Sequence, residues 1–131
     1  MSSGRRVLVV EDEALIALSL TDMLESMGLT VCGTADNVRS AVELADRDAP
    51  DLVLMDIRLR GKGDGIDAAR QIRERRATAI IFVTGSCEQE VLDRIKTIPA
   101  AALLIKPVLP AQLKSAVDAV LADTSSGLRR S

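Results

Sequence analysis

The sequence predicts an α/β fold in which helices cover both faces of one parallel sheet. Short apolar runs rich in Val, Ile and Leu alternate along the chain with amphipathic segments. Such runs are typical of strands that are buried on both faces, and the alternation is typical of doubly wound parallel sheets. The chain has 131 residues, of which 47% are hydrophobic, so it can form one domain with a substantial core.

Five strands are expected, and four of them are uninterrupted apolar runs. The second strand is a short mixed segment between Gly28 and Asp36. Pro50 separates the third strand from the helix before it, because proline disfavours continuation of a helix. In chain order, the predicted strands are residues 7–10, 30–34, 52–55, 80–83 and 102–105.

Five helices are expected in strict alternation with the strands. In the first, Ile16 and Leu20 recur on one face. Asp64 is a suitable N-cap for the third helix. Leu109 and Leu113 are expected to begin the inward face of the last helix. The helices are predicted to begin after Glu13, after Asp36 or Asn37, near Ile66, near Glu88 and near Leu109.

The predicted domain occupies most of the chain. Residues 5–122 are expected to form it, residues 1–4 to be an N-terminal extension and residues 123–131 to be a flexible C-terminal tail. There is no sign of a second domain, an internal repeat or a low-complexity block. A stand-alone domain is therefore expected.

Composition and charge argue against several functions. A net charge of −2 gives no electrostatic reason to expect a nucleic-acid partner. No apolar run approaches the roughly 20 residues of a membrane span, and the N-terminal segment is too short for a signal peptide, so a cytoplasmic location is expected. The absence of histidine excludes His-based triads and His-ligated zinc. Cys32 and Cys87 form no CxxC pair, and both are expected to be reduced.

Four of the apolar runs end in residues that can handle phosphate or a metal ion. The first run is followed by Glu11 and Asp12, the third strand by Asp56, the fourth by Thr84 and the fifth by Lys106. Because the carboxyl ends of parallel strands meet at one edge of a sheet, these groups are expected to share one pocket. Three neighbouring carboxylates repel one another, and one lysine leaves roughly two negative charges uncompensated. A hard divalent cation with oxygen ligands resolves that repulsion, and Mg²⁺ suits a site beside phosphate.

These residues, together with Pro107, resemble the conserved positions of the receiver domain of two-component response regulators. The resemblance covers about residues 5–122 and rests on the whole set in its order along the chain. It implies a flavodoxin-like (βα)5 fold, with a five-stranded parallel sheet in the order 2-1-3-4-5.

The resemblance also implies a role for each residue at the metal site. Asp56 matches the phosphoacceptor and a metal ligand. Glu11 and Asp12 match the acidic pair that holds Mg²⁺, and the backbone carbonyl of Arg58 matches the remaining protein ligand.

Two further positions match the residues that contact the phosphoryl oxygens. These are Thr84 and Lys106. Pro107 matches a proline that usually follows a cis peptide bond, so a cis bond is expected between Lys106 and Pro107. The dianionic phosphoryl group would pull on Thr84 and Lys106 and bias a two-state surface.

The implied function is a phosphorylation switch. The phosphoryl group would come from a sensor histidine kinase or a histidine phosphotransfer protein. The only chemistry expected is the domain's own phosphorylation and dephosphorylation. The face formed by the fourth helix, the fifth strand and the fifth helix would then bind a downstream protein, with the chain a monomer or a phosphorylation-dependent homodimer.

The sequence departs from the usual receiver pattern at two places. Leu103 occupies the position, three residues before the lysine, where receivers usually carry Tyr or Phe. The segment Phe82-Val83-Thr84-Gly85 resembles the Phe-Ala-Thr-Gly motif of a receiver subgroup that also lacks this aromatic residue. Arg60 replaces the proline that usually follows four residues after the phosphoacceptor, and the guanidinium of Arg58 or of Arg60 is a candidate to reach the phosphoryl group or to shield it from water.

Three alternatives remain open from the sequence. A scaffold that is silent to phosphate would keep the fold without the chemistry. A phosphatase with an aspartyl nucleophile would need a second Asp two residues after Asp56, where Arg58 stands. A flavin carrier would need aromatic side chains to stack on the ring, and Phe82 is the single aromatic residue.

Overall fold

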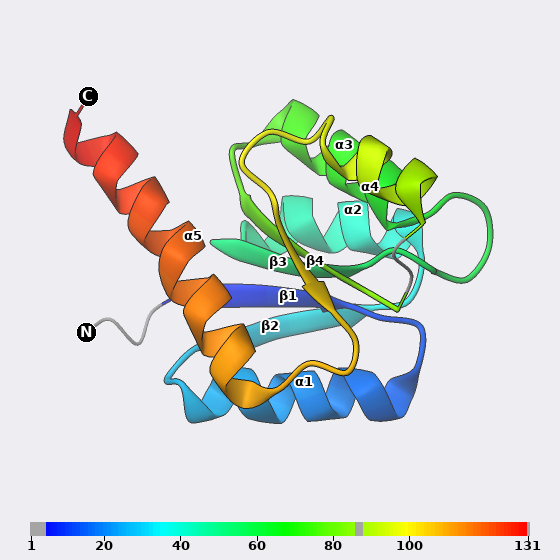
Figure 1. Ribbon diagram of the computed structural model, residues 1–131, viewed down its shortest axis with the longest axis horizontal. Coiled ribbons are helices and arrows are strands. Elements are labelled where there is room, and N and C mark those ends of the chain that lie inside the picture. The colour runs from blue at the N-terminus through cyan, green and yellow to red at the C-terminus, as the bar shows by residue number, and fades with distance from the viewer. Residues whose placement is uncertain (1–4, 86–87, 131) are drawn as a thin grey trace.

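Five parallel strands form one sheet in the order β2-β1-β3-β4-β5 in the computed structural model, which describes residues 5–85 and 88–130, and side chains as far as residue 122 (Figure 1). The predicted fold class and strand order are confirmed. The strands are β1 (Arg6–Val10), β2 (Thr30–Ala35), β3 (Leu52–Asp56), β4 (Ala79–Thr84) and β5 (Ala102–Ile105).

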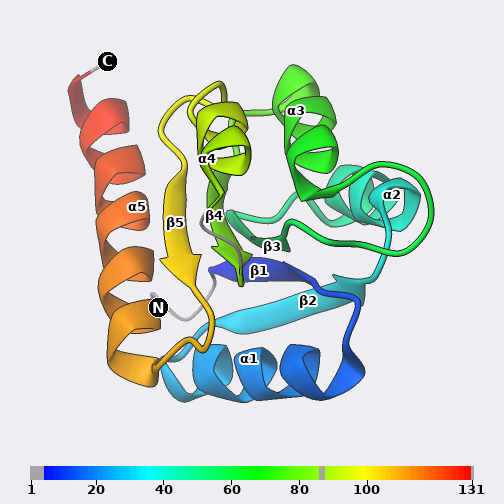
Figure 2. The same ribbon diagram turned by 45° about the vertical axis from the view of Figure 1, so that its right-hand side comes forward.

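Helices cover both faces of the sheet (Figures 1 and 2). Helices α1 and α5 pack on one face, and α2, α3 and α4 pack on the other. Parallel strands need such crossover helices, because a tight turn cannot join two parallel strands. The helices are α1 (Ala14–Ser26), α2 (Val38–Asp48), α3 (Gly65–Arg75), α4 (Gln89–Ile95) and α5 (Pro110–Arg130).

The core consists of two apolar layers, one on each side of the sheet. Successive strand residues point to opposite faces. Leu8 and Val53 therefore pack under α2 and α3, whereas Val9 and Leu54 pack under α1 and α5. Each fully buried aliphatic side chain contributes roughly 2 kcal/mol. This burial fixes the central strands, and with them the positions of the polar residues at their ends.

Local capping agrees with the sequence. The side chain of Asn37, rather than that of Asp36, caps α2 by accepting a hydrogen bond from the backbone N–H of Ser40 at 2.8 Å. Gly28 follows α1 with a φ of 87°, a conformation that glycine adopts without steric cost. Asp64 caps α3, as predicted.

Of two expectations about the C-terminal part, one stays a prediction and one is wrong. Helix α5 continues to Arg130, so the backbone of residues 123–130 is helical, and the flexibility expected of this segment stays a prediction. Once a helix is nucleated, each further residue adds a hydrogen bond at little cost. Leu109 precedes the first turn of α5 and is 57% exposed rather than inward-facing. Its backbone N–H donates to Oε1 of Gln112, which helps to begin the helix.

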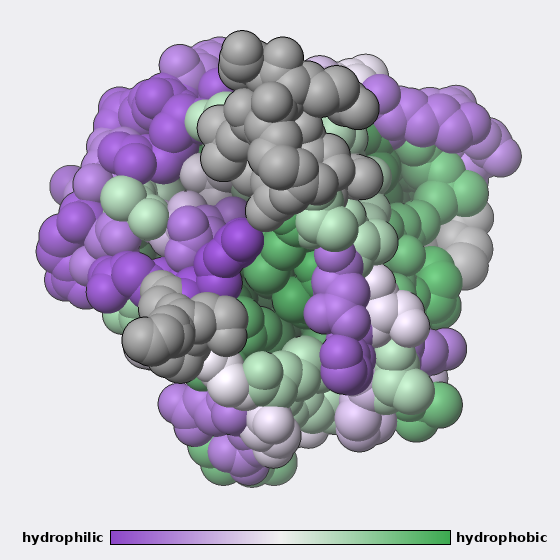
Figure 3. Space-filling model, turned by 90° about the vertical axis from the view of Figure 1, so that its left-hand side faces the viewer, coloured by the Kyte–Doolittle hydropathy of each residue, from purple (hydrophilic) through white to green (hydrophobic). Residues whose placement is uncertain are grey.

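Some apolar surface is left uncovered. Leu15, Leu18 and Ile105, besides Leu109, are large hydrophobic residues with substantial exposure. Figure 3 shows hydrophobic surface at the centre and on the right of a side view, with polar residues dominating the left. Contiguous exposed apolar surface is a common property of sites that contact other proteins.

Two sequence expectations concern residues that the structure does not describe. The predicted extension at residues 1–4 and Cys87 lie outside the described residues. Cys32 is a free thiol, and burial raises its pKa above the usual value. Among the helices described, none is both long and apolar enough to cross a membrane.

Candidate metal and phosphoryl site

The carboxyl ends of β1 and β3 lie side by side because the two strands are parallel neighbours in the sheet. Residue Val10 at the end of β1 pairs with Met55, next to the end of β3. The residues that follow are Glu11 and Asp12 on one chain segment and Asp56 on the other. Ligand oxygens from these three carboxylates all lie within 4.8 Å of one another. The tertiary structure thus brings together the three acidic residues that the sequence singled out.

Lys106 supplies a positive charge to this acidic group. Its Nζ donates a hydrogen bond to Oδ2 of Asp56 at 3.2 Å. The same Nζ lies 3.0 Å from Oε1 of Glu11, an ion pair without hydrogen-bond geometry. The backbone N–H of Lys106 donates to the carbonyl of Thr84 at 2.8 Å, so pairing of β5 with β4 holds the lysine in place. The peptide bond between Lys106 and Pro107 is cis, as predicted.

The protonation of Glu11 reflects competition between burial and charge. Burial raises the pKa of Glu11 to about 7, and the neighbouring Asp56 adds to that effect. The backbone N–H of Glu13, which donates to Oε2 of Glu11 at 3.1 Å, and the ammonium of Lys106 oppose it. Burial also disfavours the charge of Lys106, but Glu11 and Asp56 outweigh burial and raise the pKa of that lysine. The positive charge of Lys106 is therefore secure, while Glu11 readily holds a proton.

The donor set fits a hard divalent cation. Glu11 and Asp56 are buried, and all three side chains offer only oxygen ligands. Three carboxylates face the one ammonium of Lys106 among the described residues, so their negative charge is only partly balanced. A cation of charge two would complete that balance, and Mg²⁺ binds through one or two carboxylates beside phosphate. Glu11, Asp12 and Asp56 are the side chains that would hold it.

The remaining predicted residues lie at the same edge of the sheet. Thr84 ends β4 and is only 4% exposed, and its neighbour Val83 pairs with Asp56. Arg58 lies in the loop after β3 with an exposed side chain. The role of its backbone carbonyl as a metal ligand stays a prediction.

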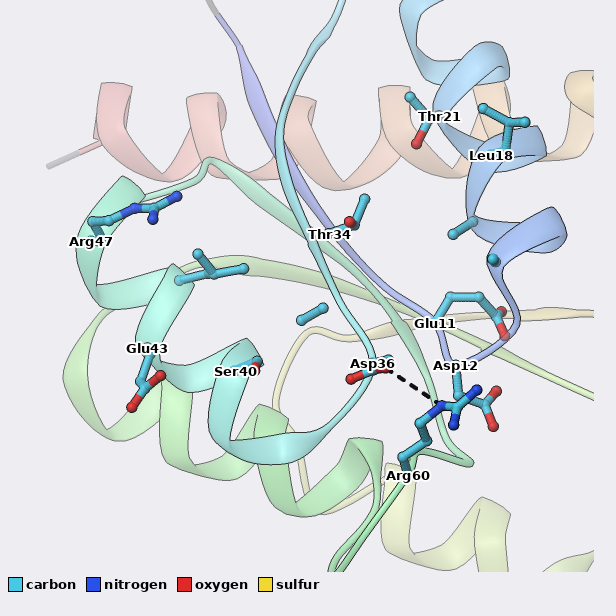
Figure 4. A pocket seen from close by; sticks show the side chains of 14 residues that line it. Glu11, Asp12, Leu18, Thr21, Thr34, Asp36, Ser40, Glu43, Arg47 and Arg60 are labelled. Atoms are coloured by element: carbon cyan, nitrogen blue, oxygen red, sulfur yellow. Dashed lines mark ion pairs between the residues drawn. The ribbon is translucent and has the colours of Figure 1, made fainter.

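Arg60 is engaged by a neighbouring carboxylate. Its Nε lies 3.5 Å from Oδ2 of Asp36, and its backbone N–H donates to the carbonyl of Asp36 at 2.9 Å (Figure 4). The two residues line a cavity of about 940 Å³ between α1 and α2, with Glu11 and Asp12 at one end. The loop after β3 is thus tied to the end of β2.

Two features near the site were not predicted. Gly65 is packed so closely that a Cβ there would overlap the carbonyl oxygen of Asp56. Arg94 of α4 forms an ion pair with Asp64, the cap of α3. The sequence shows several glycines in the loop after Asp56, but no local pattern indicates which of them contacts the backbone of Asp56. Likewise, no local pattern indicates which carboxylate pairs with Arg94.

A doubly wound parallel sheet with an acidic cluster and a lysine at the point of strand reversal defines a class of phosphate-handling α/β domains. This chain belongs to the response regulator receiver domain family, whose model matches residues 7–118. It is therefore a signalling domain of the two-component type, and the resemblance stated from the sequence is confirmed.

Relatives support this assignment along most of the chain. The transcriptional regulatory protein PdtaR of Mycobacterium tuberculosis is 40% identical over 114 residues, which are 87% of this chain and 55% of that protein. The chain thus spans about half the length of that relative. The chemotaxis protein CheY of Thermotoga maritima is 35% identical over 119 residues, 89% of this chain and 98% of that protein.

Solved structures agree with the fold. The signal receiver domain of a modulated diguanylate cyclase from Desulfovibrio desulfuricans G20 is 34% identical, with a TM-score of 0.88 over 95% of this chain and 98% of that one. The receiver domain of the PhyR response regulator from Erythrobacter litoralis is 31% identical, with a TM-score of 0.82 over 92% and 93%.

Proposed function

We propose that Asp56 accepts a phosphoryl group from a histidine kinase or a histidine phosphotransfer protein in a Mg²⁺-dependent reaction. The observation that carries the proposal is the geometry around its carboxylate. Asp56 lies beside Glu11 and Asp12 and is contacted by the ammonium of Lys106 at 3.2 Å. The membership of this chain in the receiver domain family supports the same role for Asp56.

The residues of the chain have separate parts in this reaction. An oxygen of Asp56 attacks phosphorus, the new oxygen–phosphorus bond forms, and the nitrogen–phosphorus bond to the donor histidine breaks, leaving a neutral imidazole once a proton is taken up. Lys106 and Thr84 contact the phosphoryl oxygens and offset their charge. When bound, Mg²⁺ would supply further positive charge to the transferring group, and would do the same during the later hydrolysis of the acyl phosphate by water. The product is an acyl phosphate on Asp56.

Exposed apolar residues beside the site suit the approach of a phosphodonor. Leu15 is 82% exposed and Leu18 is 58% exposed, both on α1, and Leu109 lies just before α5. A cavity of about 490 Å³ joins Leu15 to Lys106 and Pro107. A donor histidine that approaches Asp56 over this surface would contact these residues, so we assign them to the donor contact.

We assign the output of the switch to a second surface, the face formed by α4, β5 and α5. Strand β5 is an edge of the sheet, and Ile105 at its end is 42% exposed. We assign this face to a downstream protein partner or to a second copy of the chain, with phosphorylation at Asp56 altering its affinity. A cytoplasmic location belongs to the same proposal.

Intact-mass measurement tests the chemistry directly. The protein is incubated with Mg²⁺ and a small acyl phosphate. We expect a gain of one phosphoryl group, which is lost in Asp56→Asn because the amide is not a nucleophile. Asp118→Asn, on the exposed surface of α5 where Asp118 pairs with Lys114, is the matched control and should still gain the group.

Two other results would contradict the proposal. No gain of mass under any metal condition would favour a scaffold that is silent to phosphate. Steady release of phosphate from diverse phosphate esters would favour the aspartyl phosphatase.

A further inference from the structure

Helix α4 is the shortest described helix and is lightly anchored. It has seven residues, Gln89–Ile95. Its buried residue is Ile95, at its last position. A short helix with little buried surface is easily displaced, because tertiary packing supplies most of the stability of a helix in a protein.

Arg94 joins α4 to the first turn of α3. Its Nη1 donates to Oδ2 of Asp64 at 2.6 Å, and its Nη2 donates to Oδ1 of the same carboxylate at 3.2 Å. Nη2 also lies 3.5 Å from Oδ1 of Asp67. Two parallel hydrogen bonds between a guanidinium and a carboxylate fix relative orientation as well as distance. The direction of α4 is thus tied to Asp64.

The same carboxylate organises the start of α3. Oδ1 of Asp64 accepts hydrogen bonds from the backbone N–H groups of Ile66 and Asp67, each at 3.0 Å. The side chain of Asp67 accepts from the backbone N–H of Asp64 at 2.9 Å. Burial opposes the charge of Asp64, but Arg94 and the backbone N–H of Asp67 outweigh burial and lower its pKa. Arg94 is therefore bound to a rigid, charged cap.

This cap rests on the backbone of the phosphoacceptor. Gly65, which follows Asp64, donates its N–H to the carbonyl of Ile57 at 2.7 Å. A side chain at position 65 would overlap the carbonyl oxygen of Asp56. Asp56, Gly65 with its cap Asp64, and Arg94 form a short continuous path from the site to α4.

We propose that the Arg94–Asp64 ion pair couples phosphorylation of Asp56 to the position of α4, with Arg94 as a positioning residue. This inference rests on the proposed function. Leu103 on β5 stands where receivers usually carry Tyr or Phe, and it packs against the core and offers no side-chain hydrogen-bonding group. The ion pair between α4 and the start of α3 takes over the coupling role of that aromatic residue.

The coupling has a simple physical origin. A phosphoryl group brings nearly two negative charges to Asp56. The attraction between these charges and the surrounding cations moves the backbone at residues 56–58, and the Ile57 carbonyl passes that movement to Gly65 and Asp64. Because Arg94 binds Asp64 through two hydrogen bonds, α4 moves together with Asp64. Coupling of this kind is reciprocal, so a partner that holds α4 also changes the ease of phosphorylation.

Hydrogen exchange of α4 backbone amides, followed by mass spectrometry, tests the inference. The full chain is compared with and without excess acyl phosphate and Mg²⁺, and intact mass is recorded on the same samples. The variants are Arg94→Gln and Asp64→Asn, since asparagine keeps the N-cap but not the charge. Arg70→Gln is the matched control, because Arg70 joins α3 to Thr97 just beyond α4 without contacting Asp64.

We expect phosphorylation to change exchange in residues 89–95 by roughly fivefold or more in the unmodified chain and in Arg70→Gln. Arg94→Gln and Asp64→Asn should gain the phosphoryl group but show little change in exchange. The double variant should behave as either single variant does, since both changes break one interaction. Arg94→Lys should restore the response in part.

The possible failures are distinguishable. If the unmodified chain gains no mass, the proposed function is wrong and the inference falls with it. If Arg94→Gln gains the phosphoryl group and α4 responds as in the unmodified chain, the inference alone is overturned. A response lost equally in Arg70→Gln also overturns it, because any link between α3 and the α4 segment would then suffice.

Discussion

Glu11 shows how strongly the fold changes the chemistry of one residue. Its side chain is buried beside Asp56 and, within the described part of the chain, is paired with one ammonium, that of Lys106. Burial outweighs that ammonium, and the pKa of Glu11 rises to about 7. A proton on Glu11 and a divalent cation bound at the proposed site would therefore compete for the same carboxylate.

This competition predicts a pH-dependent metal affinity. If Glu11 is a Mg²⁺ ligand as proposed, Mg²⁺ would have to displace its proton when the pH is below about 7. We expect Mg²⁺ to bind about tenfold more weakly at pH 6 than at pH 8, as one displaced proton requires. Isothermal titration calorimetry at the two pH values measures this difference.

Glu11→Gln is the control for that measurement. The variant should bind Mg²⁺ more weakly at both pH values and lose most of the dependence between them. Equal affinity of the unmodified chain at pH 6 and pH 8 would show that Glu11 is already ionised or is not involved in binding.

At the scale of secondary-structure elements, the contact between the start of α3 and the end of β3 determines the shape of the site. Gly65 begins α3, and it lies directly against the backbone of Asp56. No other residue type fits, because any Cβ would displace the carboxylate-bearing residue. The glycine is required for close approach rather than for an unusual φ.

Gly65→Ala should therefore impair both folding and phosphorylation. Overpacking of this kind costs roughly 1–3 kcal/mol in the free energy of unfolding, measured by urea denaturation. The rate of phosphoryl gain should fall as well, because Asp56 moves. Gly33→Ala in β2 is the comparison, since a Cβ there would have its nearest neighbours at 3.6 Å, an ordinary contact. Equal behaviour of the two variants would contradict this account.

At the scale of the whole molecule, site occupancy and global stability are linked. A ligand that binds only the folded chain stabilises it, by about 2.7 kcal/mol at a concentration of 100 times Kd. For a domain of this size, Mg²⁺ at that concentration should raise Tm by roughly 10 °C at pH 8. Differential scanning calorimetry with Mg²⁺ and with EDTA measures the shift, which should shrink in Asp12→Asn.

Without metal, Glu11 makes the folded chain less stable as the pH rises, whereas the stabilisation by Mg²⁺ is expected to grow with pH. Its pKa is about 7 when folded, against an ordinary value of 4.5. The folded state then binds the proton more tightly, so the stabilising contribution is complete below pH 4.5 and is lost as the pH rises through 7. In EDTA, the Tm of the unmodified chain should fall between pH 6 and pH 8, and the Tm of Glu11→Gln should fall less over the same range. If Tm in EDTA does not fall over that range, burial is not the dominant influence on Glu11.

The sequence by itself determined the order of the strands and helices along the chain and which polar residues end the strands. Apolar runs and helical periodicity are local properties, so they located β3 and the residues that end it, including Asp56. The rule that parallel strands share an edge then placed Glu11, Thr84 and Lys106 near one another. These inferences need the periodicity of apolar residues, the shared edge of parallel strands, and the strand order that the family resemblance implies.

Only the tertiary structure decided how these residues interact. The raised pKa of Glu11, the Arg60–Asp36 pair and the Arg94–Asp64 pair each depend on segments that are distant along the chain. Leu109 is exposed because of where α5 begins, which its hydrophobicity does not indicate. Local patterns specify which side chains face inward, whereas burial, charge and long-range pairing arise when the elements pack together.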